Sequence, residues 1–101
     1  MLDVSVAKMA ASQLVQLYAP DKILLFGSQA KGTAGANSDI DLCVVIATDN
    51  KRRLIADMYC TIDAPKPVDI LLYTPEEWQT CIADTTSFAY QINREGVVLH
   101  G

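Results

Sequence analysis

Apolar residues recur at helical spacing near the start of the chain, from about residue 3 to residue 19. Side chains three, four and seven positions apart share one helix face, so this stretch predicts an amphipathic helix. Pro20 ends the helix because proline lacks the backbone N–H that the helical ladder needs. The segment 22–26, KILLF, then predicts a short strand that runs directly into Gly27, and the polar stretch 31–38 predicts a loop.

Two further apolar segments predict strands. Residues 39–48, DIDLCVVIAT, are apolar on both faces after their first positions, which is typical of a strand covered on both sides. Residues 68–73, VDILLY, follow a proline-rich turn and predict another strand. Between these strands, apolar residues from Leu54 to Ile62 indicate a helix that is opened by the polar pair Asp49 and Asn50.

The last third of the chain begins with a helix-start motif, residues 74–77. It places a threonine at the cap, proline at the first position and glutamate three residues after the cap. A final helical stretch through Phe88 and Ile92 stops at Gly96, and residues 97–100 predict a terminal strand. Together these elements predict an α/β fold, with one mixed sheet of three to four strands and helices packed against it.

Length and composition narrow the protein class. A chain of 101 residues, half of them hydrophobic, predicts one compact domain over residues 1–101 with its own apolar core. Eight basic residues stand against twelve acidic ones, and the formal charge of -4 disfavours a nucleic-acid partner. The basic cluster Lys51-Arg52-Arg53 is interpreted as a solvated helix end.

The cysteines and the apolar runs bear on the cellular environment. Cys43, Cys60 and Cys81 are odd in number and lack metal-type spacing, which argues against a disulfide framework and a zinc site. The first residues lack a basic leader with an apolar core, and no apolar run has the length of a bilayer-crossing helix. We therefore expect a cytoplasmic protein without a membrane partner.

Aspartates on two of the expected strands are candidates for chemistry. Side chains alternate along a strand, so Asp39 and Asp41 share one face, where their mutual repulsion makes sense if they share a cation. Asp69 lies within the apolar segment 68–73, where a lone carboxylate is costly to bury. If the two strands are neighbours, all three carboxylates converge. Taken alone, each aspartate also fits an ordinary surface strand.

A small-residue loop precedes these carboxylates. Gly27 lets the backbone approach a bulky anion, and exposed N–H groups at a helix start favour phosphate. The Ser28 hydroxyl adds a hydrogen bond and Lys31 adds a positive charge. A phosphate cradle beside a carboxylate cluster indicates metal-assisted phosphoryl chemistry. On geometry alone, the glycines at positions 27, 32 and 35 are also consistent with turns.

The run GSQAKG at 27–32, followed by SDIDL at 38–42, resembles the motif of the DNA polymerase β nucleotidyltransferase superfamily. Its small prokaryotic branch, the minimal nucleotidyltransferases, has this length and this order of elements, and Asp69 matches the third carboxylate of the family. The resemblance covers nearly the whole chain and implies a small nucleotidyltransferase fold. Related proteins often have arginine at position 31, whereas Lys31 lacks the bidentate fork of arginine.

This resemblance implies a reaction and a set of site residues. A hydroxyl would attack the α-phosphorus of a nucleoside triphosphate, expected to be ATP, and pyrophosphate would leave. Two Mg²⁺ or Mn²⁺ ions would be held by the catalytic carboxylates Asp39, Asp41 and Asp69. Nucleotide binding is expected from Gly27, Ser28, Lys31 and Ser38.

The same branch is commonly paired with helical HEPN-domain partner proteins in toxin–antitoxin modules. Our first interpretation is therefore an antitoxin that transfers AMP to a hydroxyl on such a partner. Two alternatives stay open: an antitoxin or subunit that acts by binding alone, and a transferase acting on a small molecule such as an aminoglycoside. The apolar C-terminal third predicts an exposed interface and a homo- or hetero-oligomer. Tyr18 and Tyr59 are expected in the core, and Trp78, Phe88 and Tyr90 in the core or at a partner surface.

Overall fold

The computed structural model of the chain describes residues 4–27, 30 and 39–101. Within them lies one four-stranded sheet in the order β3-β2-β1-β4. Its strands are β1 (Lys22–Phe26), β2 (Ile40–Val45), β3 (Val68–Tyr73) and β4 (Val97–His100). β2 and β3 run parallel, whereas β1 is antiparallel to both β2 and β4. The predicted α/β fold with one mixed sheet is therefore confirmed.

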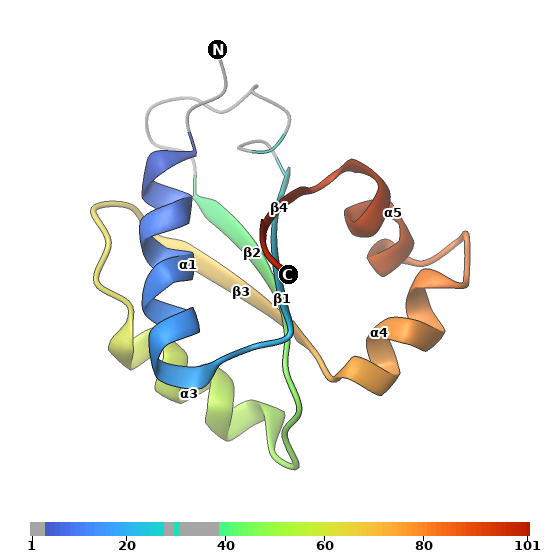
Figure 1. Cartoon of the computed structure of the whole chain (residues 1–101), viewed down its shortest axis with the longest axis horizontal. Helices are drawn as coiled ribbons and strands as arrows, with labels where there is room; N and C mark the ends of the chain where they lie inside the picture. The colour runs from blue at the N-terminus through green and yellow to red at the C-terminus, as the bar shows by residue number, and fades with distance from the viewer. Residues whose placement is uncertain (1–3, 28–29, 31–38) are drawn as a thin grey trace.

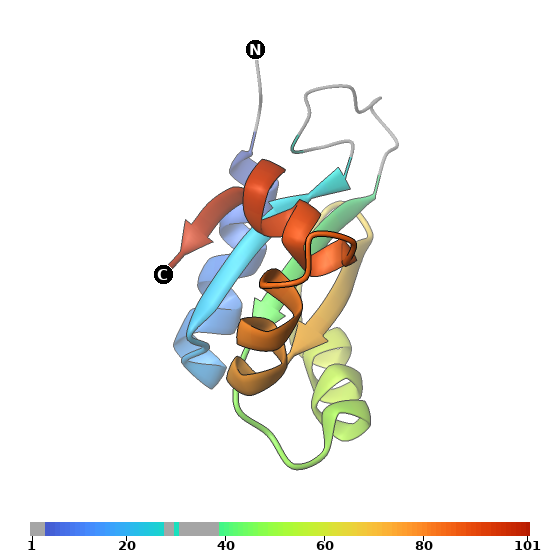
Figure 2. The ribbon, with the colours of Figure 1, turned by 90° about the vertical axis from the view of Figure 1, so that its right-hand side faces the viewer.

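Helices cover both faces of this sheet (Figure 1). One face is covered by α1 (Ser5–Tyr18) and α3 (Lys51–Thr61). The other face carries α4 (Pro75–Ile82) and α5 (Phe88–Glu95), which lie in front of the strands in Figure 2. The sheet is thus the middle layer of three, and each layer of helices has its own apolar contact with it.

The central strand β2 contributes to two hydrophobic cores. Leu42 and Val44 belong to the core beneath α1 and α3, whereas Cys43 and Val45 belong to the core that contains Trp78 of α4. All four β2 residues are buried, as the apolar pattern on both faces predicted. Burial raises the pKa of the Cys43 thiol to about 12, so this cysteine stays neutral and packs as a small hydrophobic residue.

Several element boundaries differ from the sequence prediction. α1 begins at Ser5 rather than near residue 3, and the strand expected over 39–48 is limited to β2, so Asp39 lies just before it. The last backbone contact at its far end is a hydrogen bond from the Ile46 N–H to the carbonyl oxygen of Tyr73, 3.0 Å long. β2 is therefore as long as its partner strand allows.

The two tyrosines expected in the core instead use their hydroxyl groups at its edge. Tyr59 is 45% exposed, and its hydroxyl oxygen accepts a hydrogen bond from the backbone N–H of Ile70 at 2.8 Å. Tyr18 is half-buried, and its hydroxyl bonds the carboxylate of Asp57. The apolar face of each helix was identified correctly, but the polar end of a tyrosine favours the rim of a core, where partners are within reach.

Side-chain caps fix where α3, α4 and α5 begin, and the cap of α5 is Ser87. The side chain of Asn50 accepts a hydrogen bond from the Arg53 N–H and starts α3. Thr74 and Glu77 form a reciprocal capping box at α4, with N···O distances of 3.2 and 2.9 Å. These bonds and the Lys51 ammonium, 3.0 Å away, lower the pKa of Glu77. Lys51 therefore links α3 to α4 instead of only facing solvent.

Within the described residues, none of the helices combines the length and the hydrophobicity that crossing a bilayer requires.

The capping box provides a stability test. Replacing Thr74 with alanine removes the acceptor for the Glu77 N–H, so the free energy of unfolding should fall by about 1 kcal/mol. Urea denaturation of Thr74→Ala measures this loss. Thr80→Ala is the matched control, because Thr80 is exposed inside the same helix; it should leave stability unchanged or slightly higher. Equal losses in the two variants would contradict the capping role.

Candidate functional site

Two aspartates lie opposite each other on the parallel strands β2 and β3. Asp41 of β2 and Asp69 of β3 are register partners, so their Cα atoms lie opposite each other. Two residues further along, Cys43 and Leu71 pack in the core beneath α4 and α5, which places the aspartates on that same sheet face. Asp39 lies two residues before Asp41, outside the strand and exposed. β3 therefore lies beside β2, which is the condition for convergence.

The position of Asp69 rests on this register rather than on burial. β3 is an edge strand, and the Asp69 side chain is exposed. The expectation of a costly buried carboxylate therefore does not hold for it. The backbone next to it is tied to α3, because the Ile70 N–H donates to the Tyr59 hydroxyl. α3 packs on one face of the sheet and, through this hydrogen bond, helps to hold β3. The Asp69 carboxylate of β3 lies on the other face.

The three charges interact electrostatically at Asp41. Its pKa is raised, first by partial burial, then by repulsion from Asp69 and next from Asp39. Both neighbouring carboxylates are therefore close enough to destabilise the ionised form of Asp41. Within the described ranges, however, no three His, Cys, Asp or Glu side chains are close enough together to hold one metal ion. The structure thus places Asp41 opposite Asp69 on the neighbouring strand, and the charge of Asp39 also acts on Asp41.

Gly27 brings the backbone directly against this pair. It follows β1 with a φ of 74°, in the left-handed region that disfavours residues with a Cβ atom. A Cβ atom at this position would lie 2.4 Å from Oδ2 of Asp41, closer than any real contact. The absence of a side chain at Gly27 therefore leaves room for the Asp41 carboxylate in its present orientation.

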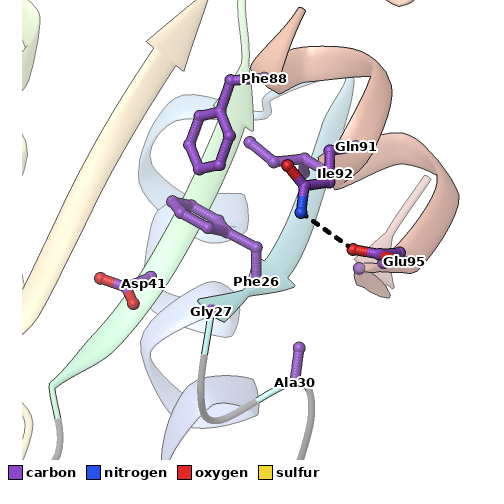
Figure 3. A pocket seen from close by; sticks show the side chains of 9 residues that line it. Phe26, Gly27, Ala30, Asp41, Phe88, Gln91, Ile92 and Glu95 are labelled. Atoms are coloured by element: carbon purple, nitrogen blue, oxygen red, sulfur yellow. Dashed lines mark hydrogen bonds between the residues drawn. The ribbon is translucent and has the colours of Figure 1, made fainter. Parts of the chain in front are cut away.

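A cavity of about 260 Å³ opens beside Asp41. Figure 3 shows the rings of Phe26, from the end of β1, and Phe88, from the start of α5, close to the Asp41 side chain. The ring centroids are 5.5 Å apart, and the ring planes meet at 84°, an edge-to-face contact. The rest of its lining is Gly27, Ala30, Gln91, Ile92, Glu95 and Gly96. We call this cavity the aromatic pocket.

Sequence reasoning did not assign the aromatic pocket to the site. Phe88 was interpreted as core or partner surface, although it is 52% exposed and lines the pocket. Phe26 was treated as the end of a strand. Its place directly before Gly27, which the sequence predicts to belong to the site, was the available clue. No local pattern brings Phe88 to the same place.

Three of the sequence-predicted nucleotide-binding residues, Ser28, Lys31 and Ser38, lie outside the residues that the structure describes. Of the predicted site, the described part comprises Gly27, Asp39, Asp41 and Asp69.

Comparison with known proteins identifies the family and the fold of the chain. A family model of the nucleotidyltransferase domain matches residues 7–95, a range that includes the three aspartates and most of the aromatic pocket. Among solved structures, the chain is similar to the crystal structure of a proposed nucleotidyltransferase from Sulfolobus solfataricus. The TM-score is 0.64 at 18% sequence identity, covering 94% of this chain and 77% of that one, which is a similarity of fold. No curated protein sequence matches the chain at a significant level.

The contact between Gly27 and Asp41 can be tested by a double-mutant cycle. Gly27→Ala should lower the free energy of unfolding by more than the left-handed backbone penalty of roughly 1–2 kcal/mol, because the new Cβ also meets the carboxylate. In an Asp41→Ala background only the backbone penalty should remain, since the Cβ of Asp41 is 3.7 Å away. Urea denaturation of the four proteins gives the coupling. A cost that is the same in both backgrounds would show that the carboxylate does not require the glycine.

Proposed function

Because this chain belongs to the nucleotidyltransferase domain family, we propose that it transfers AMP from ATP to a hydroxyl group on a partner protein. The family supports nucleotidyl transfer in general. The observation that carries the site assignment is the register pairing of Asp41 with Asp69, with the backbone of Gly27 against Asp41. Carboxylates gathered beside an open backbone suit the handling of a triphosphate with its cations.

The donor set fits divalent cations. Asp39, Asp41 and Asp69 offer only carboxylate oxygens, the ligands that Mg²⁺ and Mn²⁺ prefer. Burial, and after it repulsion from Asp69 and Asp39, raises the pKa of Asp41, and a bound cation would relieve that repulsion. Asp39 and Asp41 would hold two such ions, and Asp69 would complete one of the two sites. When bound, these ions would supply positive charge that stabilises the entering and leaving oxygens.

The residues of the chain then have separate tasks in the transfer. The acceptor oxygen forms a bond to the α-phosphorus, and the bond from that phosphorus to the pyrophosphate oxygen breaks. Asp69, exposed at the sheet edge, accepts the proton of the attacking hydroxyl. Gly27 leaves its backbone free for the outgoing phosphates. By their place in the sequence, Ser28, Lys31 and Ser38 would contribute further contacts to the nucleotide.

The proposed protein acceptor is a HEPN-domain partner, with the chain acting as the antitoxin of the pair. The motif resemblance supports this choice, and so does apolar surface left on the C-terminal third. Trp78 and Ile92 are core residues, whereas Val98 on the edge strand β4 is 53% exposed. An acceptor hydroxyl held within a complex would gain the positioning that a small transferase needs from its partner.

The assignment of the aspartates to the site can be tested first by measuring AMP transfer. Asp41→Asn should reduce transfer of labelled AMP from ATP by about 10²–10³-fold, because it removes one of the charges that hold the cations. Without divalent cations its free energy of unfolding should stay equal or rise, since the lost charge is repelled by its neighbours. Asp49→Asn, an exposed aspartate beyond the far end of β2, is the matched control and should retain full activity. Wild-type transfer rates in Asp41→Asn would contradict the assignment.

The partner is tested by co-expression with the protein encoded beside this gene. We expect a stable complex whose partner gains the mass of AMP when ATP and magnesium are added, measured by intact mass spectrometry. The Asp41→Asn chain should form the same complex and leave the partner unmodified. A tight complex without added mass would instead favour an antitoxin acting by contact alone, and the absence of a complex would favour a small-molecule acceptor.

A further inference from the structure

The aromatic pocket is the feature that the proposed transfer does not yet use. It lies on the same sheet face as Asp41, and the Asp41 side chain forms part of its wall (Figure 3). A volume of about 260 Å³ is too small for a whole nucleoside triphosphate but suits one planar ring system. Whatever occupies it therefore lies beside a group that is bound at Asp41.

The charge of the residues that line the aromatic pocket indicates which part of a nucleotide can enter it. The carboxylate of Glu95 lines the pocket outside the proposed cation site, so it would repel a phosphate group there. The Gln91 side-chain amide donates a hydrogen bond to Glu95, with an N···O distance of 3.2 Å, and this pair forms the polar rim. The interior is formed by aromatic rings and small residues. An uncharged, flat occupant is thus favoured over an anionic one.

The two phenylalanine rings are arranged to receive such an occupant. Phe26 and Phe88 touch edge to face, which leaves ring faces accessible, and Phe88 is half exposed although it is a large apolar residue. Small residues on the other side, Gly27, Ala30 and Gly96, keep space open. Gly96 has a further reason to be small, since a Cβ there would lie 2.6 Å from the carbonyl oxygen of Ile92.

We propose that the aromatic pocket binds the nucleobase of the donor nucleotide, stacked on Phe88. This inference rests on the proposed function, which places the triphosphate at Asp41 and Gly27. The base then extends from the α-phosphate into the pocket, while the phosphates stay outside it. Stacking of a base on an aromatic side chain strengthens binding substantially and tolerates different bases.

The test compares two ligands on one variant of the full chain. Phe88→Ala should weaken magnesium–ATP binding roughly tenfold or more, measured by titration calorimetry. Inorganic triphosphate with magnesium lacks a base, so its affinity should be unchanged. Phe88→Tyr keeps the ring and should retain ATP affinity. Leu17→Ala is the matched control, because Leu17 is an exposed apolar residue of α1 that does not line the pocket.

The outcomes separate this inference from the proposed function. A Phe88→Ala protein that loses ATP and inorganic triphosphate to the same extent overturns the nucleobase assignment, because the ring would then act on the whole site. So does unchanged ATP affinity in a protein that still transfers AMP, and in that case the proposed function stands. A wild-type chain that binds neither ligand with magnesium would overturn both.

Discussion

The parallel pairing of β2 with β3 is the constraint on which the rest of the site depends. β2 is buried on both faces, so a shift of one residue would exchange the side chains of its two cores and move Asp41 beneath α1 and α3. The apolar residues therefore fix the register, and the register fixes the carboxylate pair. Burial and then repulsion from Asp69 and Asp39 raise the pKa of Asp41, and burial of the neighbouring hydrophobic side chains holds this arrangement in place.

The end of β1 completes this arrangement from the other side. Phe26 is the register partner of Asp41 across the antiparallel pair, and Gly27 follows immediately with its left-handed backbone. One strand thereby contributes an aromatic wall and a backbone free of side chain at the same point. The aspartates and the Gly27 backbone are neighbours because β1 ends where β2 and β3 begin, at the same end of the sheet.

One side of α5 packs in the hydrophobic core, and another side borders the aromatic pocket. Ala89 and Ile92 are buried in the core beneath it. Phe88, Gln91 and Glu95 are spaced three and four residues apart, so they share a stripe of the helix, and this stripe borders the aromatic pocket. The same helix that closes one core thus supplies the outer wall of the candidate site. Changes that loosen its packing would also change the shape of that pocket.

Local sequence patterns were sufficient to predict the helices and strands that the structure describes. Helical spacing, proline positions, the Thr74 cap and the apolar run of β2 act within a few residues. They therefore predicted each strand and helix of the described part of the chain to within a few positions. Strand alternation predicted that Asp39 and Asp41 share one face, but Asp39 lies just before β2, so alternation does not fix the direction of its side chain. Tertiary structure alone decided that Asp69 lies opposite Asp41, that Asp69 is exposed, and that Phe88 meets Phe26. These contacts join segments far apart in the chain, and they follow from which strands pair and which helix covers them, which no local pattern encodes.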